Sequence, residues 1–202
     1  MNKKIIVSAI VLFNTFSFSA FAANKTGNID KSINVVQIDQ TSDKEALKAG
    51  SRNWQSATKG QDVFAGDKIR TGLRSVAQIN YEDGTMTRIG SRSLLTVKDR
   101  KLSLKRGYMW GKVDKTRTKG LKIFTANAIA SIIGTEFFIE AGSDGTTTLT
   151  VLEGVVELAG KKGKVSVTAG TSSIVDKDGN AGDPEVFDQN KVLERYSELL
   201  ID

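Results

Sequence analysis

The sequence predicts an all-β fold, either a rolled β-sandwich or a β-solenoid-like coil, followed by one C-terminal amphipathic helix. Hydrophobic and polar residues alternate with a period of two over most of the chain from Trp54 onward, which is typical of half-buried strands. Asp-Gly pairs separate several of these runs, and 19 Gly stand against a single Pro, so tight turns are frequent. Sandwich and solenoid share this period and these turns, so the choice between them stays open.

Residues 1–22 are expected to be a signal peptide. Lys3 and Lys4 precede an uncharged apolar run, and Ala20-Phe21-Ala22 places small residues before a cleavage site, as in Sec-type export signals. The run is shorter than the roughly 20 residues that span a bilayer. We therefore expect a bacterial protein that is periplasmic or secreted and has no transmembrane span after cleavage.

Residues 23–50 are expected to form an N-terminal lead-in with one short strand. Residues 23–34 are mostly small and polar, whereas residues 33–38 hold the first cluster of aliphatic side chains, where we place the strand. Residues 41–49 fit either a helical turn or a loop.

Residues 51–182 are expected to form the main β domain. Asp83-Gly84, Asp144-Gly145 and Asp178-Gly179 each follow an alternating run, and Gly accepts the positive φ that hairpin turns require. Further strands are expected at residues 94–98, 102–105, 108–113, 121–125, 155–159, 164–168 and 173–176.

A short pattern occurs twice in this domain. Leu-x-Leu-x-x-Gly-x-Met around Gly107 matches Leu-x-Val-x-x-Gly-x-Val around Gly154. Each copy indicates two strands hinged at a glycine, where the chain bends without an obstructing Cβ. Two copies do not establish a repeat protein, but they suit a coiled β architecture.

Residues 183–202 are expected to form the C-terminal helix. Asp183-Pro184-Glu185 offers a cap, a Pro at the first helical position and an acid in the first turn. Apolar residues then recur at helical spacing up to Leu200. This helix either packs back on the β domain or binds a partner, which includes a second copy in a dimer.

The composition excludes most catalytic chemistry. The chain has no Cys and no His, which removes thiol nucleophiles, Ser–His dyads and Cys/His zinc sites. Glu136, Glu140 and Glu153 are available for a carboxylate-based enzyme acting on carbohydrate, but nothing marks an acid or a nucleophile among them. The Asp176–Asn180 segment begins like a calcium loop and is interpreted as a turn, because Gly and Glu are missing at loop positions six and twelve. No catalytic residue, metal ligand or cofactor is predicted.

The basic charge favours an envelope partner. The net charge is +6, and it is +4 without residues 1–22, which contain Lys3 and Lys4 and no acidic residue. A weakly cationic exported protein suits anionic envelope polymers, although interspersed charges also fit a merely solvated surface. Export makes nucleic acid an unexpected partner. Residues 98–106 carry much of this charge. With no aromatic residue flanking them in register, they are expected to form a solvated strand face.

Three aromatic residues are candidate ligand contacts: Trp54, Tyr108 and Trp110. Their rings can stack on sugars or fill a partner's pocket, although a Trp in a β protein also commonly closes one end of the core. Tyr108 and Trp110 share one strand face, and Met109 lies on the other.

A series of turn and strand motifs gives a family resemblance. Ile69, Phe137 and Val151 occupy core strand positions in it, whereas its Asp-Gly pairs are turn residues. The order and spacing of the motifs resemble the FecR domain, the sensor module of iron-citrate-type regulators. The motifs are Gly60-x-x-Val63, Gly66-Asp67-x-Ile69-Arg70-Thr71-Gly72, Ser75-x-Ala77-x-Ile79, Asp83-Gly84-Thr85, Gly90-x-x-Ser93-x-Leu95, Leu104-x-x-Gly107, Gly134-Thr135-Glu136-Phe137, Thr150-Val151-Leu152-Glu153-Gly154-x-Val156 and Val167-x-Ala169-Gly170.

The resemblance implies an extracytoplasmic, non-catalytic domain that works by contact. Full-length regulators of this type carry a cytoplasmic arm and a membrane span before the domain, and neither is expected here. The chain resembles the free-standing exported FecR-domain proteins instead. The sequence thus predicts a non-enzymatic domain that binds an envelope protein or a cell-wall glycan. The alternative is a sensor subunit that regulates a separately encoded membrane protein.

Overall fold

The computed structural model describes residues 24–40, 52–116 and 120–201. The expected signal peptide and the segment 41–49 lie outside these residues. The described residues form the strands β1 Lys25–Ile33, β2 Val36–Asp39, β3 Gln55–Ser56, β4 Asp62–Phe64, β5 Lys68–Thr71, β6 Val76–Tyr81, β7 Met86–Ile89, β8 Leu94–Lys98, β9 Lys101–Lys112, β10 Leu121–Phe124, β11 Ala128–Ile132, β12 Glu136–Ala141, β13 Thr147–Glu153, β14 Val155–Gly160, β15 Gly163–Thr168, β16 Thr171–Val175 and β17 Glu185–Val186, the helix α2 Gln189–Arg195 and a 3₁₀ turn Ser197–Leu199.

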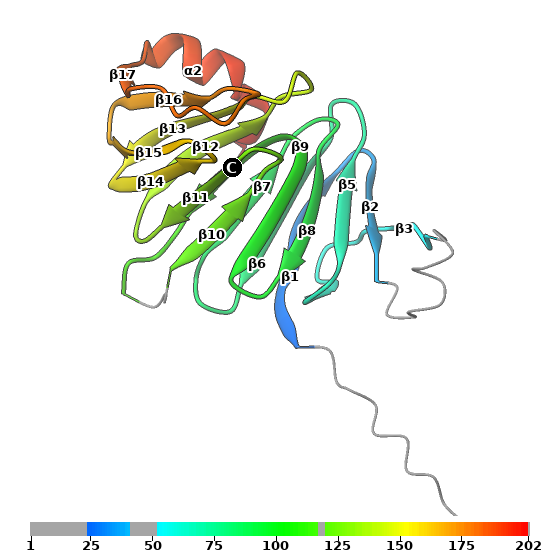
Figure 1. The fold of residues 1–202 in the computed structure, drawn as a ribbon. Coiled ribbons are helices and arrows are strands. Elements are labelled where there is room, and N and C mark those ends of the chain that lie inside the picture. Colours follow the sequence, from blue (N-terminus) through cyan, green and yellow to red (C-terminus); the bar gives the residue numbers. More distant parts are fainter. Residues whose placement is uncertain (1–23, 41–51, 117–119, 202) are drawn as a thin grey trace, which may run out of the picture.

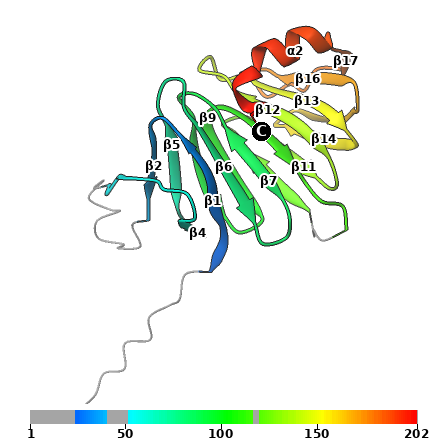
Figure 2. The same ribbon diagram turned by 180° about the vertical axis from the view of Figure 1, so that it is seen from behind.

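These strands form two layers that share β9 (Figures 1 and 2). Sheet A has the order β4-β1-β6-β7-β9-β12-β13-β16-β17. Sheet B has the order β3-β2-β5-β8-β9-β10-β11-β14-β15. Nearly all neighbours are antiparallel, and β9 with β10 is a parallel pair. The all-β prediction is confirmed.

The chain crosses between the two sheets several times, adding strands to each of them in turn. The first half of β9 pairs in sheet B and the second half in sheet A, and the crossing lies at Gly107, which has φ +92°. Gly154, at φ +86°, marks the opposite crossing from β13 to β14. The two glycines of the repeated pattern are therefore hinges, as predicted. The result is a sandwich whose chain winds like a solenoid without closing.

One hydrophobic core fills the space between the sheets. Ile69 of sheet B and Phe137 and Val151 of sheet A are fully buried in it, as their strand positions predict. Large aliphatic residues alternate with outward-facing residues on most strands, so each sheet contributes one face. Burial of this continuous apolar layer is the main favourable contribution to folding.

The lead-in contains two strands, so the prediction of one short strand there is wrong. β1 pairs with β6 over most of its length, although its sequence is polar and lacks clear alternation. Gly27 permits this pairing, because a Cβ there would lie 2.3 Å from the carbonyl oxygen of Asn80. Asn34 then adopts φ +57°, which splits the expected strand at 33–38 and sends Val36 into sheet B.

The predicted hairpin turns at Asp83-Gly84 and Asp144-Gly145 are confirmed. Both glycines have positive φ, +82° and +85°. Each aspartate accepts a hydrogen bond at 3.0 Å from the backbone N–H two residues later, an Asx turn that fixes the reversal.

The C-terminal helix begins later than predicted. Glu185–Val186 extend sheet A as β17 beside β16, so Asp183 is not the cap. Asp188 is the N-cap, and its side chain accepts hydrogen bonds from the backbone N–H groups of Asn190 and Lys191. No helix in the described part of the chain is long and apolar enough to cross a membrane.

Candidate functional site

The three candidate contact residues lie on two opposite faces of the sandwich. Tyr108 and Trp110 lie on the outer face of sheet A, beneath the C-terminal segment. Trp54 lies at the outer face of sheet B, beside Arg70. The fold therefore brings two of them together and separates the third.

Tyr108 and Trp110 belong to a second hydrophobic cluster, which covers the outside of sheet A. Trp110 is 6% exposed and packs with Phe138, Tyr196 and Leu199. The rings of Phe138 and Tyr196 stack with centroids 4.4 Å apart. Because the C-terminal segment covers this cluster, Trp110 is a packing residue and not an exposed contact.

Polar contacts hold the end of the C-terminal segment on the sheet. The Glu198 carboxylate accepts hydrogen bonds from the Tyr108 hydroxyl and from Ser91 Oγ, the latter at 3.0 Å. Arg88 donates from Nη1 to the carbonyl oxygen of Leu199 at 2.8 Å. Burial, together with Glu198, raises the pKa of Tyr108 to about 12. The Tyr108 hydroxyl thus forms its hydrogen bond within the protein.

Two of the three carboxylates considered for catalysis, Glu136 and Glu140, have structural partners. Glu136 accepts from Trp110 Nε1 at 3.1 Å and from Lys112 Nζ at 3.0 Å. Glu140 accepts from Arg195 and Tyr196 of the C-terminal segment. Both glutamates lie on β12, so these contacts join Trp110 and the C-terminal segment to that strand.

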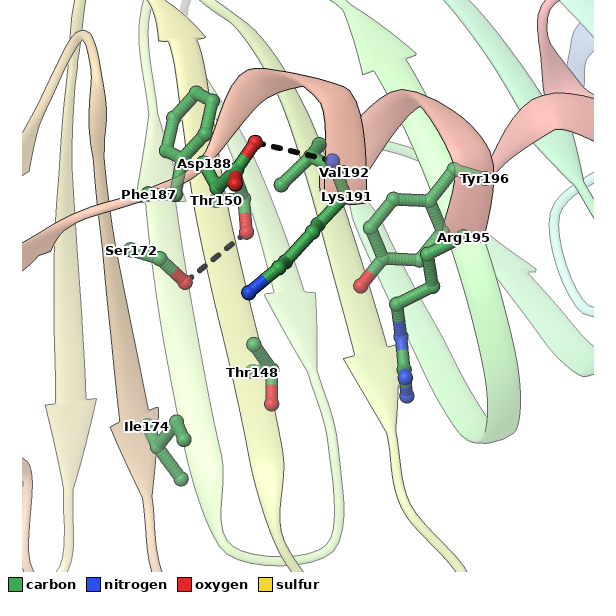
Figure 3. Close-up of a pocket in the computed structure, with 10 residues that line it drawn as sticks. All are labelled: Thr148, Thr150, Ser172, Ile174, Phe187, Asp188, Lys191, Val192, Arg195 and Tyr196. Atoms are coloured by element: carbon green, nitrogen blue, oxygen red, sulfur yellow. Dashed lines mark hydrogen bonds between the residues drawn. The ribbon is translucent and has the colours of Figure 1, made fainter.

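A groove of about 420 Å³ lies between α2 and sheet A (Figure 3). Figure 3 shows hydroxyl side chains of β13 and β16 beneath the helix, and Thr150 and Ser172 are hydrogen-bonded to each other at 3.0 Å. Ser172 Oγ also donates to the backbone carbonyl oxygen of Leu149 at 3.0 Å, so both hydroxyls form hydrogen bonds within the sheet. The lining residues are Thr148, Thr150, Ser172, Ile174, Phe187, Asp188, Lys191, Val192, Arg195 and Tyr196.

A second groove, which we call the Trp54 groove, has a volume of about 480 Å³ and lies on the outer face of sheet B. The Arg70 guanidinium lies over the Trp54 ring, 4.2 Å from its centroid, and Arg70 Nε donates to Gln37 Oε1 at 2.8 Å. Arg70 therefore packs against one face of the Trp54 indole and helps to hold the ring in place. The groove is lined by Arg52, Trp54, Lys68, Leu94, Thr96, Ser103, Lys105, Thr125 and Ala126.

Cations surround the Trp54 groove. Arg52 lies 3.6 Å from the buried carboxylate of Asp39. Burial lowers the pKa of Lys68, and the positive charges of Arg52 and Lys105 lower it further, whereas the carboxylate of Asp39 opposes this shift. Mutual repulsion of this kind makes a site that gains energy when an anion enters.

A row of side chains leads away from this groove across sheet B. Lys68, Thr96, Ser103 and Phe124 are directly opposite one another on β5, β8, β9 and β10. A further hollow of about 350 Å³ adjoins Phe124. The row therefore runs from a cation through two hydroxyls to an aromatic ring, a mixture that suits a polar ligand with an apolar face.

Of the residues on this face, Trp54 was predicted from the sequence as a contact, whereas Lys68, Thr96, Ser103 and Phe124 were not. Alternation marks each of them as outward-facing, but only strand register shows that they lie side by side. Within the described ranges, no group of three or more His, Cys, Asp or Glu side chains could hold a metal ion.

The comparisons with known proteins agree with this fold. Two crystal structures of a candidate anti-sigma factor from Parabacteroides distasonis are similar, with TM-scores of 0.56 and 0.55 and 19% sequence identity. The similarity covers 62% of this chain and 62% of theirs, and at this identity it concerns the fold alone. None of the curated proteins compared with this chain matches it. Residues 67–157 match the family model described as FecR protein, which confirms the resemblance to the FecR domain over this part of the chain.

Proposed function

We propose that this chain is an exported, non-enzymatic FecR-type module that binds a cell-envelope glycan at the Trp54 groove. One observation carries the proposal: of the three candidate aromatic contacts, Trp54 is the one that lies outside both hydrophobic clusters. Its ring lies at an open groove among cations and hydroxyls. Export rests on the sequence pattern of residues 1–22.

The chemistry of the groove favours a sugar over a protein partner. Protein-binding hot spots are typically dry apolar pockets with aromatic anchors. Here Thr96 and Ser103 present hydroxyls in the groove that contains Trp54, and Ser103 is directly opposite Phe124. Hydroxyls beside aromatic rings match the hydroxyl groups and C–H faces of a pyranose. An aromatic face supplies the apolar contact, and hydroxyls and cations supply the polar ones.

A non-enzymatic role is supported by the partners of the carboxylates. Glu136 and Glu140 are each held by a cation and by an aromatic donor. The chain also has no His and no Cys, the most frequent proton-transfer and nucleophilic groups.

A second candidate is a sensor subunit that regulates a separate membrane protein. The name of the similar structures, anti-sigma factor, favours a regulatory role. The observation that supports it here is α2, whose outer side, with Leu193 and Glu194, faces solvent and lies outside the groove beneath the helix. A partner on this side would be lost in Leu193→Glu/Glu194→Lys, which leaves the buried Tyr196 in place.

Sedimentation with insoluble cell-wall polysaccharide tests the leading proposal. The chain lacking residues 1–22 should sediment with the polysaccharide, and Trp54→Ala should weaken binding at least 10-fold because the stacking face is lost. Ile133→Ala is the control, since Ile133 is 62% exposed and lies outside this groove. Equal binding by both variants and the parent would overturn the proposal. In vivo crosslinking to one dominant membrane protein, abolished by the α2 variant, would favour the sensor role instead.

A further inference from the structure

We infer that the glycan is anionic, and that it runs from the Trp54 groove across a lysine ladder formed by Lys98, Lys101 and Lys122. This inference rests on the proposed function and adds the charge of the ligand and its path. It assigns a role to the three lysines, which lie outside the lining of the Trp54 groove.

The lysine ladder is fixed by strand register. Lys98 of β8 is directly opposite Lys101 of β9, and Lys101 is directly opposite Lys122 of β10. All three side chains are exposed. Their strand neighbours, among them Leu102 and Ile123, are fully buried in the core, so the lysines point away from the core on the outer face of sheet B.

This arrangement costs stability in the free protein. Neighbouring strands are about 4.8 Å apart, and like charges directly opposite each other on a sheet destabilise it. Among residues 24–40, 52–116 and 120–201, no carboxylate forms an ion pair with Lys98, Lys101 or Lys122. A bound polyanion would neutralise all three charges at once.

The ladder is continuous with the Trp54 groove. Thr96 and Lys98 are consecutive outward residues of β8, and Ser103 and Lys101 are consecutive outward residues of β9. Consecutive outward residues on a strand are about 6.6 Å apart. The same face carries Lys68 and Lys105 in the groove itself. A ligand that reaches both places must be extended, which favours a polymer with repeated negative charges.

A polysaccharide, rather than an anionic membrane, fits the shape of this face. Trp54 and the hydroxyls of Thr96 and Ser103 line a concave groove, whereas membrane-surface binding uses protruding apolar residues that enter the lipid. Carboxylate and phosphate groups offer the same charge chemistry, so the experiment must tell them apart.

Binding of defined polymers to the chain lacking residues 1–22 tests the inference. The probes are polygalacturonate, which bears carboxylates, inorganic polyphosphate, and neutral dextran. We expect at least one anionic probe to bind 10-fold or more tighter than dextran in 50 mM salt, and to weaken steeply at higher salt because screening reduces charge attraction. The stronger anionic probe identifies the charged group.

Charge-removing variants locate the site. Lys98→Gln/Lys101→Gln/Lys122→Gln should weaken anionic binding at least 10-fold. The matched control removes three exposed lysines elsewhere, Lys59→Gln/Lys177→Gln/Lys191→Gln, and should retain most of the binding. Equal losses in both triple variants would mean a non-specific charge effect and would overturn the inference.

The two proposals fail in different ways. If Trp54→Ala abolishes binding to cell-wall polysaccharide but the ladder variant does not alter it, the inference is wrong and the proposed function stands. If neither variant alters wall binding, both are wrong. Tighter binding to anionic phospholipid vesicles than to either anionic polymer would replace the polysaccharide with a membrane surface and overturn the inference.

Discussion

Arg195 and Glu140 form a bidentate ion pair that joins α2 to β12. Nε of Arg195 lies 2.9 Å from Oε2 of Glu140, and Nη2 lies 2.8 Å from Oε1. The Arg195 side chain is 62% exposed, and an exposed pair contributes at most about 1 kcal/mol. The attachment of the C-terminal segment therefore depends mainly on the apolar residues beneath it.

Tyr196→Ala is expected to destabilise the protein by about 3–5 kcal/mol, as for other large buried aromatic residues. Tyr196 is 2% exposed and stacks on Phe138, so the change leaves a cavity. Urea unfolding followed by Trp fluorescence measures the loss. Leu193→Ala, on the exposed side of α2, should change the free energy of unfolding by less than about 0.5 kcal/mol. A loss of similar size in both variants would contradict the packing described.

Gly107→Ala is expected to destabilise more than Gly60→Ala. Both glycines have positive φ, +92° and +84°, which costs an L-residue about 1–2 kcal/mol. At Gly107 a Cβ would also lie 2.1 Å from Ser93 Oγ and 2.6 Å from Ser93 Cα, whereas nothing lies within 4 Å at Gly60. The clash adds about 1–3 kcal/mol. Equal thermal shifts in the two variants would show that the hinge tolerates a side chain.

The free energy of unfolding is expected to fall above pH 10. Burial raises the pKa of Tyr108 to about 12, from an ordinary 10.0, and raises the pKa values of Tyr81 and Tyr196 as well. Above pH 10 the unfolded tyrosines lose their protons and the folded ones keep them. The folded state then binds more protons, so its stability decreases as pH rises. Below pH 10 this contribution is constant.

Absorbance at 295 nm tests the tyrosine behaviour. Folded protein at pH 11 should show little tyrosinate, and the signal should rise together with unfolding. In Tyr108→Phe the fall in stability between pH 10 and pH 12 should be smaller than in the parent chain. Full tyrosinate absorbance in a folded protein at pH 10.5 would contradict the burial of these rings.

Lys101→Glu is expected to stabilise the free protein by about 0.2–1 kcal/mol in low salt. The substitution replaces two like-charge pairs, with Lys98 and Lys122, by opposite-charge pairs across the strands. Thermal unfolding at 20 mM and 500 mM salt measures the gain, which should shrink at the higher concentration. Lys59→Glu, at an exposed turn residue that is not part of the ladder, is the control and should have almost no effect. A destabilised Lys101→Glu protein would argue against mutual repulsion in the ladder.

Several features of the fold follow from local sequence. The period-two alternation places Ile69, Phe137 and Val151 in the core, and Asp-Gly pairs predict turns because few other residues accept positive φ. The repeated pattern around Gly107 and Gly154 predicts both hinges. In contrast, β1 pairs through its backbone although its sequence does not alternate. β17 lies where the sequence predicts the first turn of a helix capped by Asp183, whereas the cap is Asp188. Neither has a local signal strong enough to identify it.

The sequence by itself determined an all-β chain with a FecR-type segment and without His or Cys chemistry, because composition, motifs and alternation are local properties. Only the tertiary structure decided which aromatic residues are available. Trp110 is covered by a segment more than eighty residues later in the chain, and Trp54 comes to lie beside the cations of β5 and β9. Residues 98–106 were expected to form a solvated strand face with no aromatic residue beside it, but Ser103 and Lys105 line the groove that contains Trp54. Register between distant strands sets these distances, and alternation within one strand carries no information about its neighbours.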